Sequence, residues 1–257
     1  MEEGMEEGFM SAYETFASVY DLFMEQVEYD EWLDHIHAVW EKYGIAPKTI
    51  LDLGCGTGSI LLPLAQEGFD VIGVDLSSEM LTEADHKAME AGVSVRLACQ
   101  DMTELDLGEQ ADCILSLCDC MNYLTEEGQL AAAFRRIAAH MKPESILLFD
   151  MNTEYKFREV LGQKVFGAAE EAAAYIWEND YDEEEKINEY YVSFFIAQEN
   201  GLYERVEEYH YERAYATEEI EQALQAAGLA LLEVTDGYCF APPQEKSERL
   251  LFVAKLK

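Results

Sequence analysis

The sequence predicts an α/β fold: a doubly wound, seven-stranded, mostly parallel sheet with a small antiparallel β insert after its fifth strand. Two observations lead to this fold class. From residue 48 to 150, short apolar runs alternate with helix-forming segments, as in parallel strands joined by right-handed crossovers. From 152 to 215, aromatic and acidic residues alternate instead, and this pattern is typical of antiparallel strands.

Two helices are expected before the sheet, over 12–25 and 29–43, because aromatic residues recur along one face of each. The parallel part of the sheet then follows in order. Strands are expected at 48–53, 70–75, 94–98, 111–116 and 144–150, and helices at 58–66, 78–91 and 127–141.

Local signals mark several boundaries. Asp-Leu-Ser-Ser-Glu at 75–79 offers an N-cap for the second of these helices. Lys142-Pro143-Glu144 is expected to break the chain before the fifth strand. Asn200-Gly201, between two alternating segments, predicts a hairpin turn. A helix at 217–228 and strands at 229–237 and 248–256 complete the sheet.

These elements predict two units. Residues 1–150 and 216–257 are expected to form the main domain, with the helices of 12–43 at its start, and residues 151–215 a β subdomain. In open α/β sheets, ligands lie beyond the carboxyl ends of the strands, so an insert after the fifth strand can cover a site there as a lid. The alternative is a hairpin layer that only stabilises the fold.

The most informative segment is Leu-Asp-Leu-Gly-Cys-Gly-Thr-Gly-Ser at 51–59. An apolar strand passes here into Gly54, Gly56 and Gly58 and then into a helix. Glycine permits positive φ and lets backbone N–H groups approach a ligand. The next strand ends in Asp75, whose carboxylate can accept two hydrogen bonds from a ribose diol. The turn and the acid together predict a nucleoside-cofactor site on a Rossmann-like sheet.

The glycine spacing separates two cofactors. Dinucleotide sites usually show Gly-x-Gly-x-x-Gly, whereas this chain has Gly-x-Gly-x-Gly preceded by Asp52. A carboxylate is unfavourable beside a pyrophosphate but compatible with a cationic amino-acid tail. The segment resembles the first motif of the class I methyltransferases that use S-adenosyl-L-methionine. The alternative is a tight strand–helix turn that binds no ligand.

The resemblance implies roles for further residues. Asp101, after the third strand, would accept from the adenine amino group, the Met102 N–H would reach a ring nitrogen, and Met80 would cover an adenine face. Asp101 could instead cap a turn, and Met80 could be ordinary core. An N-terminal tyrosine, Tyr13 or Tyr20, would contact the cofactor carboxylate. The remaining implied cofactor-binding residues are Cys55, Leu76, Gln100, Ser116 and Leu117.

Three longer segments, at 13–21, 29–32 and 208–215, extend the resemblance almost from end to end. They resemble a bacterial family of small S-adenosylmethionine-dependent methyltransferases. That family is similar in layout to the amino-sugar N,N-dimethyltransferases and, more distantly, to glycine N-methyltransferase. The resemblance implies a small-molecule methyl acceptor, which we expect to be an amine.

An amine must arrive neutral or lose a proton, so a carboxylate, His or Tyr beside the transfer path would serve as a base. The candidates are Tyr123, after the fourth strand, and Tyr209 and His210 in the insert. Their structural alternatives are packed rings and a strand histidine satisfied by its neighbours. Nucleobase methyltransferases carry an Asn/Asp-Pro-Pro-aromatic tetrad or a Pro-Cys pair after the fourth strand, and this sequence has neither.

Composition narrows the partners. The formal net charge of −36 disfavours nucleic acid and anionic membranes, and no apolar run is long enough to span a membrane. The six cysteines form no Cys-x-x-Cys pair, so we expect reduced thiols, no metal site and a cytoplasmic location. The start, Met-Glu-Glu-Gly, is unlike a signal peptide. Nothing in the sequence indicates the oligomeric state.

Two other functions remain open at this point. An NAD-dependent oxidoreductase could use the same sheet, but the sequence lacks clear dinucleotide spacing and a hydride-positioning residue. A non-catalytic binding protein could keep the fold for a partner. The acids at Asp52, Asp75 and Asp101 disfavour that alternative, because a protein without chemistry has no physical need for them.

Overall fold

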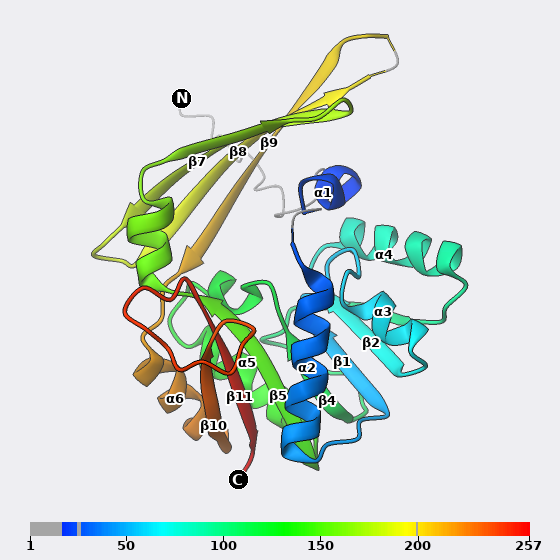
Figure 1. The fold of residues 1–257 in the computed structure, drawn as a ribbon, viewed down its shortest axis with the longest axis vertical. Coiled ribbons are helices and arrows are strands. Elements are labelled where there is room, and N and C mark those ends of the chain that lie inside the picture. Colours follow the sequence, from blue (N-terminus) through cyan, green and yellow to red (C-terminus); the bar gives the residue numbers. More distant parts are fainter. Residues whose placement is uncertain (1–16, 25–26, 199) are drawn as a thin grey trace, which may run out of the picture.

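The computed structural model describes residues 17–24, 27–198 and 200–257, which form two β-sheets with helices around one of them (Figure 1). The larger sheet has seven strands in the order β10-β11-β5-β4-β1-β2-β3, and the smaller has four in the order β6-β7-β8-β9. The start of the predicted helix at 12–25, with Tyr13, lies outside the described residues.

The seven-stranded sheet confirms the predicted fold class. Neighbouring strands from β3 to β5 pair in parallel, whereas β11 pairs antiparallel with both β5 and β10. The strands are β1 (Thr49–Leu53), β2 (Asp70–Asp75), β3 (Arg96–Cys99), β4 (Ala111–Ser116), β5 (Met141–Asn152), β10 (Leu229–Asp236) and β11 (Arg249–Leu256).

Helices cover both faces of this sheet. The apolar sides of α2 and α3 pack on one face, and those of α5 and α6 pack on the other. α2 and α4 end at Gly44 and Gly92, which adopt the left-handed backbone typical of helix C-termini. The helices are α1 (Ala17–Met24), α2 (Tyr29–Tyr43), α3 (Leu61–Gln66), α4 (Ser78–Ala91), α5 (Gln129–Ala139) and α6 (Thr217–Ala226).

The core lies on both faces of the central strands. Phe149 of β5 stacks on Phe252 of β11 with ring centroids 4.9 Å apart and contacts Phe134 of α5 at 5.2 Å. All three rings are fully buried. Burying a side chain of this size contributes about 1.5–3 kcal/mol, so these contacts hold the strand ends that carry the site in fixed positions.

The insert forms the antiparallel sheet that the alternation predicted. Its strands are β6 (Val165–Ala169), β7 (Ala173–Asp182), β8 (Ile187–Ala197) and β9 (Tyr203–Arg213). Asn200-Gly201 lies between β8 and β9, where Gly201 has φ +77°. A π-helical turn, η2 (Lys156–Leu161), connects β5 to this sheet.

Two elements begin three residues away from their predicted starts. β5 begins at Met141 rather than 144, because the pairing with β4 shifts register between Ala111 and Cys113 and leaves the exposed Pro143 in the resulting bulge. Proline is tolerated at a bulge because no ladder hydrogen bond is required there. α3 begins at Leu61 rather than 58, since the glycine turn extends through the first residues of the predicted helix.

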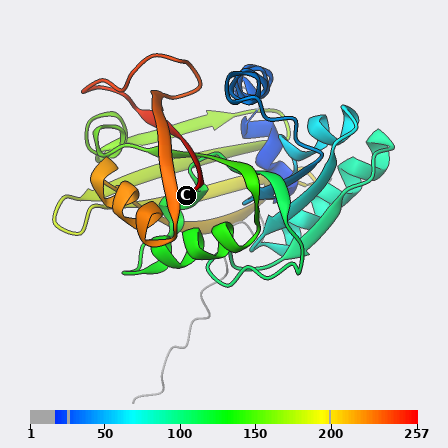
Figure 2. The same ribbon diagram turned by 90° about the horizontal axis from the view of Figure 1, so that it is seen from below.

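The four-stranded sheet lies across one end of the seven-stranded sheet (Figures 1 and 2). The 3₁₀ turn η1 (Cys120–Tyr123), after β4, joins them: Asn122 Nδ2 donates to the carbonyls of Asn152 at 3.2 Å and Arg213 at 2.8 Å. These acceptors end β5 and β9 respectively. Among the described helices, none is long and apolar enough to cross a membrane.

We expect Ser77→Ala to lower the free energy of unfolding by about 1 kcal/mol. Ser77 is the N-cap of α4, and its Oγ accepts from Met80 N at 3.2 Å, so the substitution leaves that donor without its partner. Urea denaturation measures the change. Ser78→Ala, one residue further on the exposed side, is the matched control and should alter stability by less than about 0.5 kcal/mol. Equal losses in the two variants would contradict the capping role.

Candidate cofactor and acceptor site

The glycine turn brings backbone close to β2 and to η1. Gly54, Gly56 and Gly58 have φ of +73°, +52° and +87°. The N–H groups of Gly54 and Cys55 donate to the carbonyl of Val74 at 2.7 and 3.1 Å. A Cβ on Gly54 would collide with the Cys120 thiol, whereas a Cβ on Gly56 would meet nothing within 4 Å. Gly54 is therefore required for packing, and Gly56 leaves open space at the wall of a cavity.

Asp75 ends β2 and faces that cavity. Its Oδ2 accepts from Gly56 N at 2.8 Å and its Oδ1 from Ser77 N at 2.9 Å. Burial raises the pKa of Asp75, while the N–H groups of Ser77 and Gly56 act in the opposite direction. Each carboxylate oxygen has two lone pairs, so each can accept one further hydrogen bond. The arrangement is suited to a vicinal diol such as a ribose.

The cavity beside Asp75 has a volume of about 250 Å³ and lies at the carboxyl ends of the parallel strands. It brings together many of the residues that the sequence singled out. These are Tyr20, Gly54, Gly56, Asp75, Leu76, Met80, Gln100, Asp101 and Met102. Sequence reasoning missed other lining residues, among them Val74, Ser77, Cys118, Cys120, Leu124 and Gln129, because they lack a distinctive motif.

The position of Asp101 is compatible with both predicted roles, an acceptor for adenine and a cap for a turn. It lines the cavity, but its Oδ1 also accepts from the backbone N–H and the hydroxyl of Thr103, both at 2.7 Å. Gln100 pairs with the backbone of Asp106 in the same loop. The loop after β3 is thus ordered by its own side chains. Met80 is fully buried at the cavity wall, so it too is both core and lining.

A smaller cavity of about 40 Å³ lies below the glycine turn. It is lined by Asp52, Cys55 and Leu117, three predicted cofactor residues that do not reach the larger cavity. Burial, and then the nearby Asp75 carboxylate, raise the pKa of Asp52 to about 7. Gly58 and Ser116 line neither of these two cavities. Gly58 packs against Leu62, and Ser116 is fully buried at the end of β4.

A third cavity, of about 340 Å³, lies between the inner face of the four-stranded sheet and the strand ends of the larger one. It shares Tyr20, Cys118 and Tyr123 with the cavity beside Asp75. Tyr20 and Cys118 also line the small cavity, so all three meet at these two residues. A cofactor bound along the glycine turn would therefore have this junction next to it.

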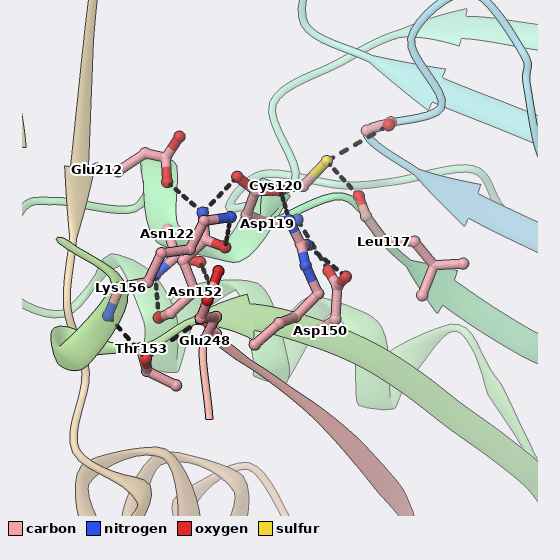
Figure 3. Close-up of polar contacts among 12 residues, drawn as sticks. Leu117, Asp119, Cys120, Asn122, Asp150, Asn152, Thr153, Lys156, Glu212 and Glu248 are labelled. Carbon is pink, nitrogen blue, oxygen red and sulfur yellow. Dashed lines mark hydrogen bonds and ion pairs between the residues drawn. The ribbon is translucent and has the colours of Figure 1, made fainter. Parts of the chain in front are cut away.

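The junction depends on an unusual turn. Cys118 and Asp119 have φ of +62° and +57°, a conformation that is costly for side chains with a Cβ. The Asp119 N–H donates to Asp150 Oδ1 at 2.8 Å, and Arg249 Nη2 donates to Asp119 Oδ1 at 2.8 Å (Figure 3). Arg249 Nη1 also donates to Asp150. Burial, and then Asp119, raise the pKa of the Cys118 thiol to about 12, which favours the protonated thiol.

A buried amide extends this network to the insert. Asn152 Nδ2 donates to Asp119 at 2.6 Å and to Glu212 of β9 at 3.2 Å, and Lys156 Nζ donates to Asn152 Oδ1 at 2.8 Å (Figure 3). Although burial acts against it, Arg249 holds the pKa of Asp119 below its ordinary value. Burial, and then Asp119, raise the pKa of Glu212 well above its ordinary value. The cavity wall thus combines one carboxyl group whose pKa is lowered with one whose pKa is raised.

Two of the three predicted catalytic residues come together. Tyr123 Oη lies 3.3 Å from His210 Nδ1, and His210 Nε2 lies 3.1 Å from Glu208 Oε2. Tyr123 and His210 line the 340 Å³ cavity. Tyr209 lies on the opposite face of β9, is 52% exposed and lines none of the three cavities. Glu208 was missed, although its spacing of two residues from His210 places both on one strand face.

The described residues include no group of three or more His, Cys, Asp or Glu side chains arranged to hold a metal ion. The cysteines that the sequence suggested to be reduced all have free thiols.

Comparison with known proteins identifies the class. Residues 50–144 match the methyltransferase domain family. The chain is 38% identical over 244 residues to a methyltransferase-family protein of Geobacillus sp. (strain WCH70), covering 95% of this chain and 99% of that one. A solved S-adenosylmethionine-dependent methyltransferase from Clostridium acetobutylicum is 34% identical and superposes with a TM-score of 0.86, covering 95% and 98% of the two chains.

A third relative is a dTDP-3-amino-3,4,6-trideoxy-α-D-glucopyranose N,N-dimethyltransferase of Streptomyces venezuelae, 29% identical over 136 residues, covering 52% of this chain and 56% of that one. The chain belongs to the class I S-adenosylmethionine-dependent methyltransferases. Its cofactor is S-adenosylmethionine, and the open wall at Gly56 and the carboxylate of Asp75 fit that group.

We expect Asp75→Ala to weaken the binding of S-adenosylhomocysteine by about a hundredfold or more. The substitution removes a buried carboxylate that can accept two charge-assisted hydrogen bonds, each contributing about 1.5–3 kcal/mol. Isothermal titration calorimetry measures the loss. Asp70→Ala, at the exposed opposite end of β2, is the matched control and should bind like the parent chain. NADH should not bind either protein, and tight NADH binding would contradict the cofactor assignment.

Binding of S-adenosylhomocysteine should strengthen as the pH rises toward 7. Asp52, whose pKa is raised to about 7, holds its proton below that pH. The cationic amino-acid tail of the bound ligand favours the ionised form of this carboxyl group. Binding then releases a proton, and affinity should rise about tenfold between pH 5.5 and 7. Calorimetry in buffers of different ionisation enthalpy detects this proton. Asp52→Asn should flatten the dependence, and an unchanged slope in that variant would assign the proton to another group.

Proposed function

We propose that this chain transfers a methyl group from S-adenosylmethionine to a small-molecule amine. The observation that carries the proposal is the junction of the cavities. We call the 250 Å³ cavity beside Asp75 the cofactor cavity and the 340 Å³ cavity the acceptor cavity. Their walls share three residues, Tyr20, Cys118 and Tyr123. A group leaving the cofactor cavity at this junction therefore lies next to the acceptor cavity.

S-adenosylmethionine, when bound, supplies a sulfonium methyl group that is already electrophilic. The residues of the chain then need to align the acceptor with that group and exclude water, and such alignment can contribute roughly 7–11 kcal/mol. The four-stranded sheet supports this role as a lid, because its inner face supplies one wall of the acceptor cavity through Tyr190 and His210. The division of the chain at 151–215 into a lid subdomain is part of this proposal.

Acidic groups in the acceptor cavity support an amine. Asp119 and Glu212 both line it, and their carboxyl oxygens can accept hydrogen bonds from an amino group, while the charge of Asp119 is paired with Arg249. The Streptomyces venezuelae relative acts on an amino sugar, which has the same kind of nucleophile. The net charge of −36 is also consistent with a cationic acceptor and unfavourable for nucleic acid.

The contacts of His210 support a role as proton acceptor. Glu208 beside Nε2 favours the tautomer with its hydrogen on that nitrogen, which leaves the lone pair of Nδ1 directed to the Tyr123 hydroxyl. An ammonium group at the junction could lose its proton to His210, directly or through the Tyr123 hydroxyl. Glu208 would then stabilise the imidazolium that forms. Tyr123 and His210 are thus the proposed catalytic residues, and Glu208 is a positioning residue.

The other functions considered have less support. The full-length relatives are methyltransferases rather than oxidoreductases, and the chain keeps both a cofactor cavity and a separate cavity for a second molecule. A protein that only bound the cofactor would not require the second cavity or the Tyr123–His210–Glu208 chain. A cytoplasmic location, expected from the reduced cysteines, remains part of the proposal.

We expect His210→Asn to lower kcat for an amine acceptor by about 10²–10⁴-fold. Tyr123→Phe should lower it by about tenfold or less. Loss of a general base accounts for the larger effect. Glu208→Gln should lower kcat and move the acidic limb of the pH–rate profile, which loss of packing alone would not do. Calorimetry with S-adenosylhomocysteine should give unchanged affinity for His210→Asn and Glu208→Gln, because neither residue lines the cofactor cavity.

Tyr209→Phe is the matched control, since Tyr209 is the neighbour of His210 on the outer face of β9 and lines none of the cavities. Its kcat should equal that of the parent chain. A loss in Tyr209→Phe comparable to that in His210→Asn would contradict the proposed proton path. Unchanged turnover in His210→Asn would do the same.

A further inference from the structure

We propose that the acceptor is an amphiphilic amine, whose amino group lies at the polar end of the acceptor cavity and whose alkyl or aromatic body fills an apolar end. This inference rests on the proposed function, because it concerns the same cavity. It adds the chemical class of the acceptor, which neither the methyltransferase family nor the cofactor fixes.

The acceptor cavity changes in polarity along β8 and β9. Its polar end is formed by Asp119, Asn152, Lys156, His210 and Glu212. Its apolar end is formed by Met24, Val27, Leu161, Tyr175, Val192 and Phe194. On β8, Tyr190 lies opposite His210, and Phe194 lies four residues further along the strand. At about 3.4 Å per residue, Val192 lies roughly 7 Å and Phe194 roughly 14 Å beyond Tyr190, so the apolar residues extend away from the polar end.

The apolar end is part of the core of the four-stranded sheet. Val192 is 9% exposed and Phe194 3%, and both pack with Leu161 in one cluster. An anionic group placed there would lose its hydration without gaining a partner, which is strongly unfavourable. Glu208 also lies on this strand face, but it contacts His210 and is not among the residues that line the cavity.

The basic groups of the cavity are at its polar end. Among the described lining residues they are Lys156 and Arg249, and Arg249 donates to Asp119 and Asp150. A diphosphate attached to the acceptor would therefore find no cation in the apolar half. At about 340 Å³ it lies within the range of roughly 300–1,000 Å³ typical of small-molecule sites.

Tryptophan fluorescence offers a test that does not require turnover. Of the three tryptophans, Trp32 and Trp177 line the acceptor cavity, whereas Trp40 is buried in the main core beside Cys113. The full chain, saturated with S-adenosylhomocysteine, is titrated with n-butylamine, n-hexylamine and n-octylamine. We expect Kd to fall by about fourfold for each added methylene until the cavity is filled. Trp177→Phe should reduce the signal, and Trp40→Phe should keep it.

A pair of variants tests the location of the apolar body. Val192→Thr places a hydroxyl in the apolar wall at nearly the same volume, and it should weaken n-octylamine binding by about tenfold and n-butylamine binding by less than twofold. Ile176→Thr, on the exposed outer face of β7, is the matched control and should change neither. Unchanged S-adenosylhomocysteine affinity shows that both variants are folded.

The outcomes separate this inference from the proposed function. A Kd independent of chain length, tighter binding of ethanolamine than of n-octylamine, or equal effects of Val192→Thr and Ile176→Thr would overturn the amphiphilic acceptor and leave the methyltransferase proposal intact. Equal binding of n-octanol would overturn the amine. Failure of the parent chain to bind S-adenosylhomocysteine would overturn the proposed function. Mass increases of one or two methyl groups on n-octylamine, with S-adenosylmethionine, would support both.

Discussion

The pairing of Arg249 with Asp119 and Asp150 holds the turn on which all three cavities depend. Two successive residues with left-handed backbone, Cys118 and Asp119, would each be destabilised by about 1–2 kcal/mol. The turn persists because both the backbone N–H and the carboxylate of Asp119 are bound. Without the guanidinium, two buried carboxyl groups would lack a cation, which costs several kcal/mol. The buried charges thus fix local geometry rather than overall stability.

The same network sets the position of the four-stranded sheet relative to the strand ends of the larger sheet. Asn152 ends β5 and joins Asp119 of the main sheet to Glu212 of β9. Asn122 makes the parallel connection through backbone carbonyls of β5 and β9. Because polar groups buried between the sheets must find partners, neither sheet can shift without leaving some of them unpaired. Both walls of the acceptor cavity are therefore held in one register.

Features that depend on residues close together in the sequence could be predicted, and features that depend on residues far apart could not. The glycine turn and Asp75 belong to a short local pattern, so the sequence was sufficient to predict them. The contact of Arg249 with Asp119 joins residues 130 positions apart, and only the fold brings them together. Tyr209 was misplaced relative to His210 because both faces of β8 and β9 carry aromatic residues, as Tyr190 and Tyr191 show, and alternation alone does not tell which face is buried. Pro143 was read as a break because a bulge leaves no signal in the sequence.

The negative charge of the chain favours the ammonium form of an amine, whereas methyl transfer requires the neutral form. The acceptor cavity, with a polar and an apolar end, can meet both requirements. An acidic protein attracts a cationic amine, but it also stabilises the ammonium form, which has no lone pair to attack a methyl group. Burial disfavours the charged form of an amine, and enclosure of the amino group at the polar end, beside the buried His210 and Asn152, contributes that desolvation once the acceptor is bound. The proton then needs an acceptor inside the cavity, and His210 lies at the polar end with its Nδ1 directed to Tyr123. Attraction outside the cavity and deprotonation within it can therefore operate in sequence.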